Sequence, residues 1–332
     1  MPPLYLTQQN AKIRIHERRL LVELDGEELL HVPLGHVSEV VVFGNVGLST
    51  PAIGRLLDEG IAVTFLREDG GYRGSLSAGL TPHVPLRRAQ YRALEQEGFA
   101  LTMAKGFVRA KLQHQRALLQ RHNRERNDPE IAACVVQVAD GLAQLERRMQ
   151  VSSLLGTEGS ASAAYFRGFK RLFAPEWKFE NRNRRPPADP VNVLLSLGYT
   201  LLGQVTAAAV QSVGLDPYAG FLHEVAYNRP SLGLDLLEEF RPVVDGVVLW
   251  ACNSEQVTPA DFTPGPPERP VILSDAGCKR FIKAYETRLD GRFTHPISGL
   301  KLTLRQCVIE QARQIAGRIN ENRPGYTGMG FR

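Results

Sequence analysis

Residues 77–86 read SAGLTPHVPL, and the pattern of the sequence differs on the two sides of this stretch. The stretch is short and contains a glycine and two prolines, which is typical of a linker. Before it, apolar residues form short alternating or continuous runs; after it, they recur about every 3.6 residues. The linker therefore predicts a boundary between a β domain, residues 1–76, and a larger helical domain, residues 87–332.

Strand patterns fill the first of these domains. The runs with the alternation or the β-branched content of strands are LYLT, AKIRIH, RLLVEL, LLHVP, SEVVVFG and IAVTFLRE. One helix is expected before the last run, with Thr50 as N-cap, Pro51 at its first position and Gly60 at its C-terminal stop. We therefore predict a small β-sandwich-like domain that holds one helix.

Helical periodicity dominates the rest of the chain. Helices are predicted near 87–97, 99–125, 130–154, 158–173, 190–214, 231–250, 274–289 and 302–320. Residues 190–215 carry no charge and are long enough to span a membrane, but several amide and hydroxyl side chains interrupt them. We interpret this segment as a buried core helix. The expected fold class is α+β, with an all-α catalytic domain after the β domain.

Composition narrows the class of protein. The four cysteines, at 134, 252, 278 and 307, form no CxxC pair and no zinc spacing. The first residues lack the apolar core of a signal peptide, so a reduced, cytoplasmic protein without membrane association is expected. Net charge is +5, yet residues 1–80 hold seven Lys/Arg against ten Asp/Glu. Any nucleic-acid surface is therefore expected in the C-terminal part.

Residues 220–242, GFLHEVAYNRPSLGLDLLEEFRP, gather a histidine and several carboxylates. His223 begins a sequence like the metalloprotease HExxH motif, but a tyrosine replaces the second histidine. Asp235 and Glu238 are three residues apart, so they lie on nearly one face of a helix. A structural histidine beside a solvated helix, with an ordinary Glu238–Arg241 pair, explains the same pattern. The residues alone leave both interpretations open.

Glu158 is the third candidate for chemistry. It lies in LLGTEGSASAAYFRGF, residues 154–169, where we expect the first turn of a helix. A carboxylate in a first turn is electrostatically favourable, which explains Glu158 without a function. The glycines around it would also let another backbone or a ligand approach closely.

Taken in order, three sequence blocks resemble one family. GTEGSASAAYF, NRRPPADPVNVLLSLGY and GFLHEVAYNRPSLGLDLLEEFRP are similar to signature blocks of the CRISPR-associated spacer integrase, the universal "protein one" of that system. Each block alone is a weak signal. Three blocks in order, behind a β domain, are specific, and the resemblance extends across the chain.

The resemblance implies a set of site residues. In that family a glutamate, a histidine and an aspartate or glutamate bind a divalent metal, and these catalytic and metal-binding roles fall on Glu158, His223 and Glu238. The third ligand in this chain is glutamate rather than aspartate. Asp235 matches a nearby acidic position that is often part of the site. Arg241 stands where members carry a basic residue near the site, and it is a DNA-binding candidate. Such ligands suit Mg²⁺ or Mn²⁺.

Basic clusters are candidates for DNA binding. Residues 103–126 hold seven Lys/Arg and one Glu, although a solvated helix face explains that run equally well. The loop NRNRRPP adds Arg182, Arg184 and Arg185. Such clusters neutralise phosphates without reading sequence. Trp177, close by in the sequence, is expected to stack on a displaced base.

The function implied is metal-dependent DNA integration in CRISPR adaptation, with endonuclease activity. A 3′-hydroxyl would attack a phosphodiester and insert a new spacer into the repeat array. The implied partners are a second copy of the chain, paired through the β domain, the small CRISPR-associated "protein two", and double-stranded spacer-precursor and leader–repeat DNA. The alternatives are a structure-selective metal-dependent nuclease outside spacer acquisition and a non-catalytic DNA-binding scaffold.

Overall fold

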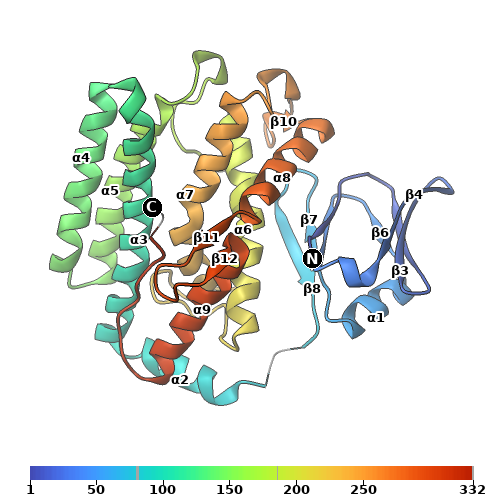
Figure 1. The fold of residues 1–332 in the computed structure, drawn as a ribbon, viewed down its shortest axis with the longest axis horizontal. Coiled ribbons are helices and arrows are strands. Elements are labelled where there is room, and N and C mark those ends of the chain that lie inside the picture. Colours follow the sequence, from blue (N-terminus) through green and yellow to red (C-terminus); the bar gives the residue numbers. More distant parts are fainter. Residues whose placement is uncertain (80–81, 185, 331–332) are drawn as a thin grey trace. The chain divides into compact units, whose positions relative to one another are not determined.

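The computed structural model describes residues 1–79, 82–184 and 186–330 of the chain. The chain forms two compact units, Met1–Leu80 and Thr81–Arg332 (Figure 1). The linker expected at 77–86 includes residues 80 and 81, which lie outside the described residues. Helix α2 (Val84–Leu94) begins within the last part of that range, three residues earlier than the periodicity indicated.

The N-terminal unit contains two four-stranded sheets. One has the order β1 (Leu4–Leu6), β5 (Glu39–Phe43), β7 (Ala62–Leu66), β8 (Tyr72–Leu76), and the other has the order β4 (Glu27–Pro33), β3 (Arg19–Leu24), β2 (Lys12–His16), β6 (Gly47–Leu48). Ile13 and Leu20 of the second sheet share one buried core with Val40 and Val63 of the first. The expected β-rich unit is confirmed, and its core joins both sheets.

One helix, α1 (Thr50–Asp58), completes this core in the described part of the unit. It connects the parallel strands β5 and β7 and buries Leu56 completely. Its N-cap is Ser49, whose hydroxyl accepts a hydrogen bond from the Ala52 amide, and not Thr50 as the sequence indicated. Moving the N-cap from Thr50 to Ser49 loses no hydrogen bond within the helix, because residues of the first turn have no carbonyl partner there for their amides and proline has no amide hydrogen.

The second unit is mainly helical, as expected. After α2 it contains α3 (Glu97–Arg126), α4 (Pro129–Gln144), α5 (Val151–Lys170), α6 (Pro190–Ser212), α7 (Ser231–Asn253), α8 (Asp275–Leu289) and α9 (Leu304–Asn320). The domain is not strictly all-α. Two short antiparallel hairpins, β9 (Phe262–Pro264) with β10 (Val271–Leu273) and β11 (Arg292–Thr294) with β12 (Lys301–Thr303), lie on either side of α8 in the chain.

The helix expected at 130–154 is interrupted in the structure. Residues Leu145–Arg147 tighten into a 3-10 turn after α4, and Gln150 has an extended backbone that no α-helix can continue. Helix α5 therefore begins at Val151, well before the expected start at residue 158. Glu158 consequently lies in the interior of α5, so the favourable first-turn position proposed from the sequence does not explain it.

Helix α7 is central to the helical unit, and most of its residues are buried. It packs along α6 and α3 and also contacts α8 and α9 (Figure 1). Helix α6 is long and apolar enough to cross a membrane by length and composition, but 56% of its most apolar window is buried inside the unit. Its polar residues Asn192 and Thr206 are completely buried as well. These contacts make α6 a core helix, as expected.

Candidate metal and nucleic-acid site

A buried lysine joins two of the predicted site residues. Lys111 of α3 is 6% exposed, and its ammonium donates a hydrogen bond to Glu158 of α5. The same nitrogen lies 2.6 Å from Oε2 of Glu238 on α7. Ser162, one turn after Glu158, donates a hydrogen bond to Oε1 of Glu158 at 2.8 Å. One cation therefore links carboxylates that are 80 residues apart in the sequence.

Sequence reasoning missed Lys111. It was one of seven basic residues in the run 103–126, and nothing in its neighbours distinguished it. The one available signal was its place on the face of α3 that also carries the buried Ala104, Phe107 and Leu112. A lysine among such residues is seldom buried without a carboxylate partner.

His223 enters the site from the loop before α7. Its Nδ1 lies 2.8 Å from Oδ1 of Asp235, and its Nε2 lies 3.8 Å from Oε1 of Glu238. Asp235 also accepts the backbone amides of Phe221, Leu222 and His223 at 2.6, 3.0 and 2.9 Å. A carboxylate oxygen accepts hydrogen bonds, so Nδ1 is the ring nitrogen that donates to Asp235. Asp235 thus orients His223 and fastens its loop to α7.

Positive charge surrounds the carboxylate of Glu238. Burial alone would raise its pKa, but the charges of Arg241, Lys111 and His223 outweigh burial and hold the pKa well below its usual range. Arg241 Nε lies 2.9 Å from Oε1 of Glu238. Glu238 is therefore ionised at neutral pH, although its side chain is only 6% exposed.

Glu158, His223 and Glu238 are the residues that would hold a divalent cation. Within the described residues, no three His, Cys, Asp or Glu side chains stand in a metal-coordinating arrangement. The ammonium of Lys111 lies between Glu158 and Glu238. Oε2 of Glu238 nevertheless has no hydrogen bond of good geometry, despite its close ion pair. Two carboxylates that share a cation, beside an oriented imidazole, fit Mg²⁺ or Mn²⁺.

The residues expected to bind DNA behave differently from one another. Arg184 is exposed, whereas Arg182 donates to Oδ1 of Asn192 at 2.7 Å and to Oγ of Ser196 at 3.1 Å. Burial lowers the pKa of Arg182 to about 10. Its guanidinium thus ties the loop to α6. Arg185 lies outside the described residues.

The position of Trp177 contradicts the role expected from the sequence. It is 3% exposed, and its ring contacts that of Phe262 edge-on with centroids 6.3 Å apart. A buried indole offers no face to a displaced base, so the predicted stacking role is contradicted. Trp177 instead anchors the 3-10 turn Pro175–Trp177 in the core of the unit.

Many of the basic side chains on α3 pair with carboxylate or carbonyl groups of the protein itself. Besides Lys111, Arg109 pairs with Glu146, and Arg126 donates to the backbone carbonyls of Arg171 and Leu172. Arg121 and Arg124 are exposed near the end of α3. The charge available for phosphates on this helix is therefore concentrated toward its C-terminal end.

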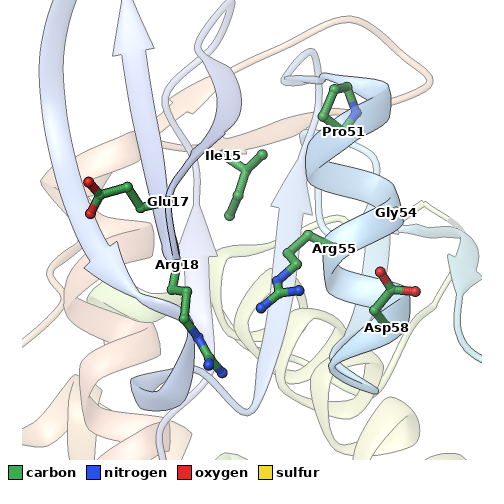
Figure 2. A pocket seen from close by; sticks show the side chains of 7 residues that line it. All are labelled: Ile15, Glu17, Arg18, Pro51, Gly54, Arg55 and Asp58. Atoms are coloured by element: carbon green, nitrogen blue, oxygen red, sulfur yellow. The ribbon is translucent and has the colours of Figure 1, made fainter.

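A separate hollow of about 550 Å³ lies in the N-terminal unit, against α1 (Figure 2). Ile15, Glu17, Arg18, Pro51, Gly54, Arg55 and Asp58 line it. Arg18 and Arg55 both pair with Glu59, at 3.2 and 2.8 Å, so their charges are partly neutralised. The hollow contains none of the predicted site residues, and we do not assign the chemistry to it.

Comparison with known proteins gives the family. A family model described as CRISPR associated protein Cas1 matches residues 4–287. The "CRISPR-associated endonuclease Cas1 3" of Thermus thermophilus is 35% identical over 331 residues, which cover 99% of this chain and 95% of that protein.

Two solved structures resemble the whole chain. A casposase bound to integration product aligns with a TM-score of 0.87 at 24% identity, covering 98% of this chain and 93% of that one, and shows the fold alone. A chain of a Cas6-RT-Cas1–Cas2 complex aligns with a TM-score of 0.84 at 25% identity, covering 99% of this chain and 36% of that one. Since family model and relative both span most of its length, this chain belongs to the Cas1 family of CRISPR-associated proteins.

Proposed function

We propose that this protein is a metal-dependent DNA integrase of CRISPR adaptation, which joins a 3′-hydroxyl of a new spacer to a phosphodiester of the repeat array. Its membership of the Cas1 family makes it a CRISPR-associated endonuclease, a phosphodiester-acting enzyme. The observation that carries the proposal is the convergence of Glu158, His223 and Glu238 near one buried cation.

Each residue has a chemical part in the proposal. Glu158, Glu238 and Nε2 of His223 would hold Mg²⁺ or Mn²⁺, which when bound polarises a phosphodiester and favours ionisation of a hydroxyl. Asp235 keeps His223 in the tautomer that leaves Nε2 free to bind. Arg241 lies within contact of Glu238 and would stabilise negative charge that develops on phosphate oxygens.

Lys111 has a second role in this proposal. Its ammonium lies between two carboxylates and offsets the repulsion between them in a buried site. The long, flexible side chain can move away when a divalent cation enters, and its charge is then available to a phosphate. The two carboxylates would thus have a cation between them both before and after the metal binds.

The partners follow from the same proposal. A related chain has been solved in a Cas6-RT-Cas1–Cas2 complex, which supports a Cas2 partner here. The casposase of the same fold was solved bound to an integration product, which is consistent with the proposed integration reaction. We propose in addition a homodimer paired through the N-terminal unit, and a cytoplasmic location, where a repeat array is accessible.

The proposal predicts the outcome of a strand-transfer assay. The protein, with its Cas2 partner, a short duplex with free 3′ ends, a leader–repeat DNA and Mn²⁺, should yield joined strands. Glu158→Ala, His223→Ala and Glu238→Ala should each lower the rate by more than about 100-fold, because each removes part of the metal site. Glu125→Ala, an exposed carboxylate on α3, should match the wild type. Equal activity in all four variants would sink the assignment.

Metal binding can be followed without any DNA. Mn²⁺ should raise the thermal midpoint of the wild type by mass action, and Glu238→Gln should abolish that rise. Asp235→Asn should lower the midpoint even without metal, because an NH2 group replaces one of the two oxygens that accept these hydrogen bonds, but should retain a measurable Mn²⁺ response. The opposite pattern would make Asp235 the ligand and Glu238 its support.

A structure-selective nuclease is the second candidate. The relative from Thermus thermophilus is named an endonuclease, and the same residues could activate water in place of a 3′-hydroxyl. Product analysis separates the two reactions, because integration lengthens the labelled strand and hydrolysis only shortens it.

A further inference from the structure

The C-terminal tail of the chain is buried on the helices that carry the cluster. After α9 the tail runs without regular structure along α3 (Figure 1), yet Tyr326 is 3% exposed and Met329 is 2% exposed. The rings of Tyr326 and Phe107 of α3 lie 4.5 Å apart. A short irregular segment seldom buries two large side chains unless specific contacts hold it in place.

A second buried carboxylate holds the tail. Glu239 is completely buried, and it accepts hydrogen bonds from the Tyr326 hydroxyl, the Met329 amide and the Gln311 side chain of α9. Gln311 also donates to the Tyr326 hydroxyl at 2.7 Å and to the Thr327 carbonyl at 3.2 Å. One carboxylate and one amide therefore fasten tail, α7 and α9 together.

Glu239 follows Glu238 directly, so the two side chains leave α7 about 100° apart. Glu238 points to Lys111 and His223, and Glu239 points to the tail. The same turn is linked to α3, because the Glu239 carbonyl lies 2.9 Å from Nδ1 of His114. Any rotation of α7 that moves Glu238 must therefore disturb the tail contacts as well.

The tail also touches α3 just before Lys111. A Cβ placed on Gly106 would lie 2.6 Å from the carbonyl oxygen of Tyr326, so only glycine allows this approach. Gly328 in turn packs directly on Ala110, the residue before Lys111. The tail thus packs closely against α3 near Lys111, the residue that pairs with Glu158 and Glu238.

From these contacts we infer that the C-terminal tail is a strap that sets the distance between Lys111 and Glu238, with Glu239 and Tyr326 as positioning residues for the reaction. The expected effect on the strand-transfer rate rests on the proposed function. It does not place Glu239 or Tyr326 in contact with substrate; they act through α3 and α7.

The test adds one methyl group between α3 and the C-terminal tail. Gly106→Ala should displace Tyr326 without weakening α3, because alanine is the better helix former. We expect the strand-transfer rate at saturating DNA to fall about tenfold or more, since displacements of about 1 Å can cost up to ~100-fold. The KM for DNA should not change, and the Mn²⁺ concentration for half-maximal thermal stabilisation should rise.

Matched variants separate positioning from stability. Gly98→Ala on the same helix places its methyl group in open space and should behave as wild type in both assays. Tyr326→Phe keeps the ring but removes the hydroxyl donated to Glu239, and should repeat the effect of Gly106→Ala in weaker form. A lower thermal midpoint for Gly106→Ala and Tyr326→Phe, with the rate and the Mn²⁺ response unchanged, would overturn the inference.

The two proposals fail in different ways. A wild-type protein that joins no DNA would count against the proposed function, whereas an unaltered Mn²⁺ midpoint in Gly106→Ala would count against the strap. Amide hydrogen exchange over residues 103–115 gives a third readout. Faster exchange there in Gly106→Ala than in Gly98→Ala is expected if the tail holds this part of α3 in place.

Discussion

At the scale of single residues, Asp245 shows how the core of α7 supports the cluster. It is completely buried and accepts hydrogen bonds from the hydroxyls of Tyr165 and Tyr199. The guanidinium of Arg241, which contacts Glu238, lies 4.9 Å from the Tyr199 ring centroid, so Tyr199 contacts both Asp245 and Arg241. Burial raises the pKa of Asp245 to about 6, because two neutral donors compensate only part of the lost hydration.

This pKa predicts a pH dependence of stability. The folded value of about 6 lies above the usual value near 3.8, so the folded state binds the proton more tightly. Stability from Asp245 should be highest below about pH 4 and fall by up to about 3 kcal/mol as pH rises to 6. The free energy of unfolding of wild type relative to Asp245→Asn, from urea unfolding at about pH 4.5 and 7, should therefore be larger at the lower pH. A difference independent of pH would contradict the prediction.

At the scale of elements, the contact between α6 and α7 depends on glycine. A Cβ on Gly198 would lie 2.5 Å from Cγ1 of Val244, whereas a Cβ on Gly203 would meet only Leu237, at 3.9 Å. Both glycines lie in residues 190–215, the uncharged segment that the sequence indicated as a buried core helix. The close approach of α7 to α6 requires a glycine only at position 198 of these two.

These two positions form a matched pair. Gly198→Ala should lower the free energy of unfolding by about 1–3 kcal/mol, because the packed interface must open to admit the methyl group. Gly203→Ala should be neutral or stabilise by about 0.5–1 kcal/mol, because alanine favours the helix. Urea unfolding of both variants gives the comparison. If Gly198→Ala and Gly203→Ala changed the free energy of unfolding by the same amount, the prediction would be wrong.

At the scale of the whole molecule, positive charge is concentrated in the helical unit. The net charge of +5 conceals an acidic N-terminal unit and a basic helical unit. Contacts within the helical unit engage Lys111, Arg109 and Arg182. Long-range attraction depends on the total charge, but phosphate contacts depend on the cations that reach solvent, such as Arg184.

Salt dependence should distinguish these two kinds of arginine. Arg184→Ala should weaken binding of duplex DNA equally for all sequences and reduce the slope of log K against log salt by about 0.9, with the thermal midpoint unchanged. Arg182→Ala should instead lower the thermal midpoint, because Asn192 and Ser196 lose their donor. Filter binding from about 50 to 200 mM salt measures the slope. An unchanged slope for Arg184→Ala would exclude a phosphate contact there.

Local patterns predicted the fold class and the order of elements, because periodicity and capping depend on neighbouring residues. They failed between α4 and α5, where α4 ends at Gln144 and the extended backbone of Gln150 immediately precedes α5. The site residues Glu158, His223 and Glu238 came from a family pattern, and their metal-binding role stays a prediction.

The sequence by itself determined that this protein has a β-rich unit, a helical unit and the signature blocks of its family. Only the tertiary structure decided that Lys111 lies between Glu158 and Glu238, that Asp235 orients His223, that Trp177 is buried, and that the C-terminal tail packs on α3. The physical reason is distance along the chain. Periodicity describes which face of an element is buried, but it does not determine which distant element covers that face.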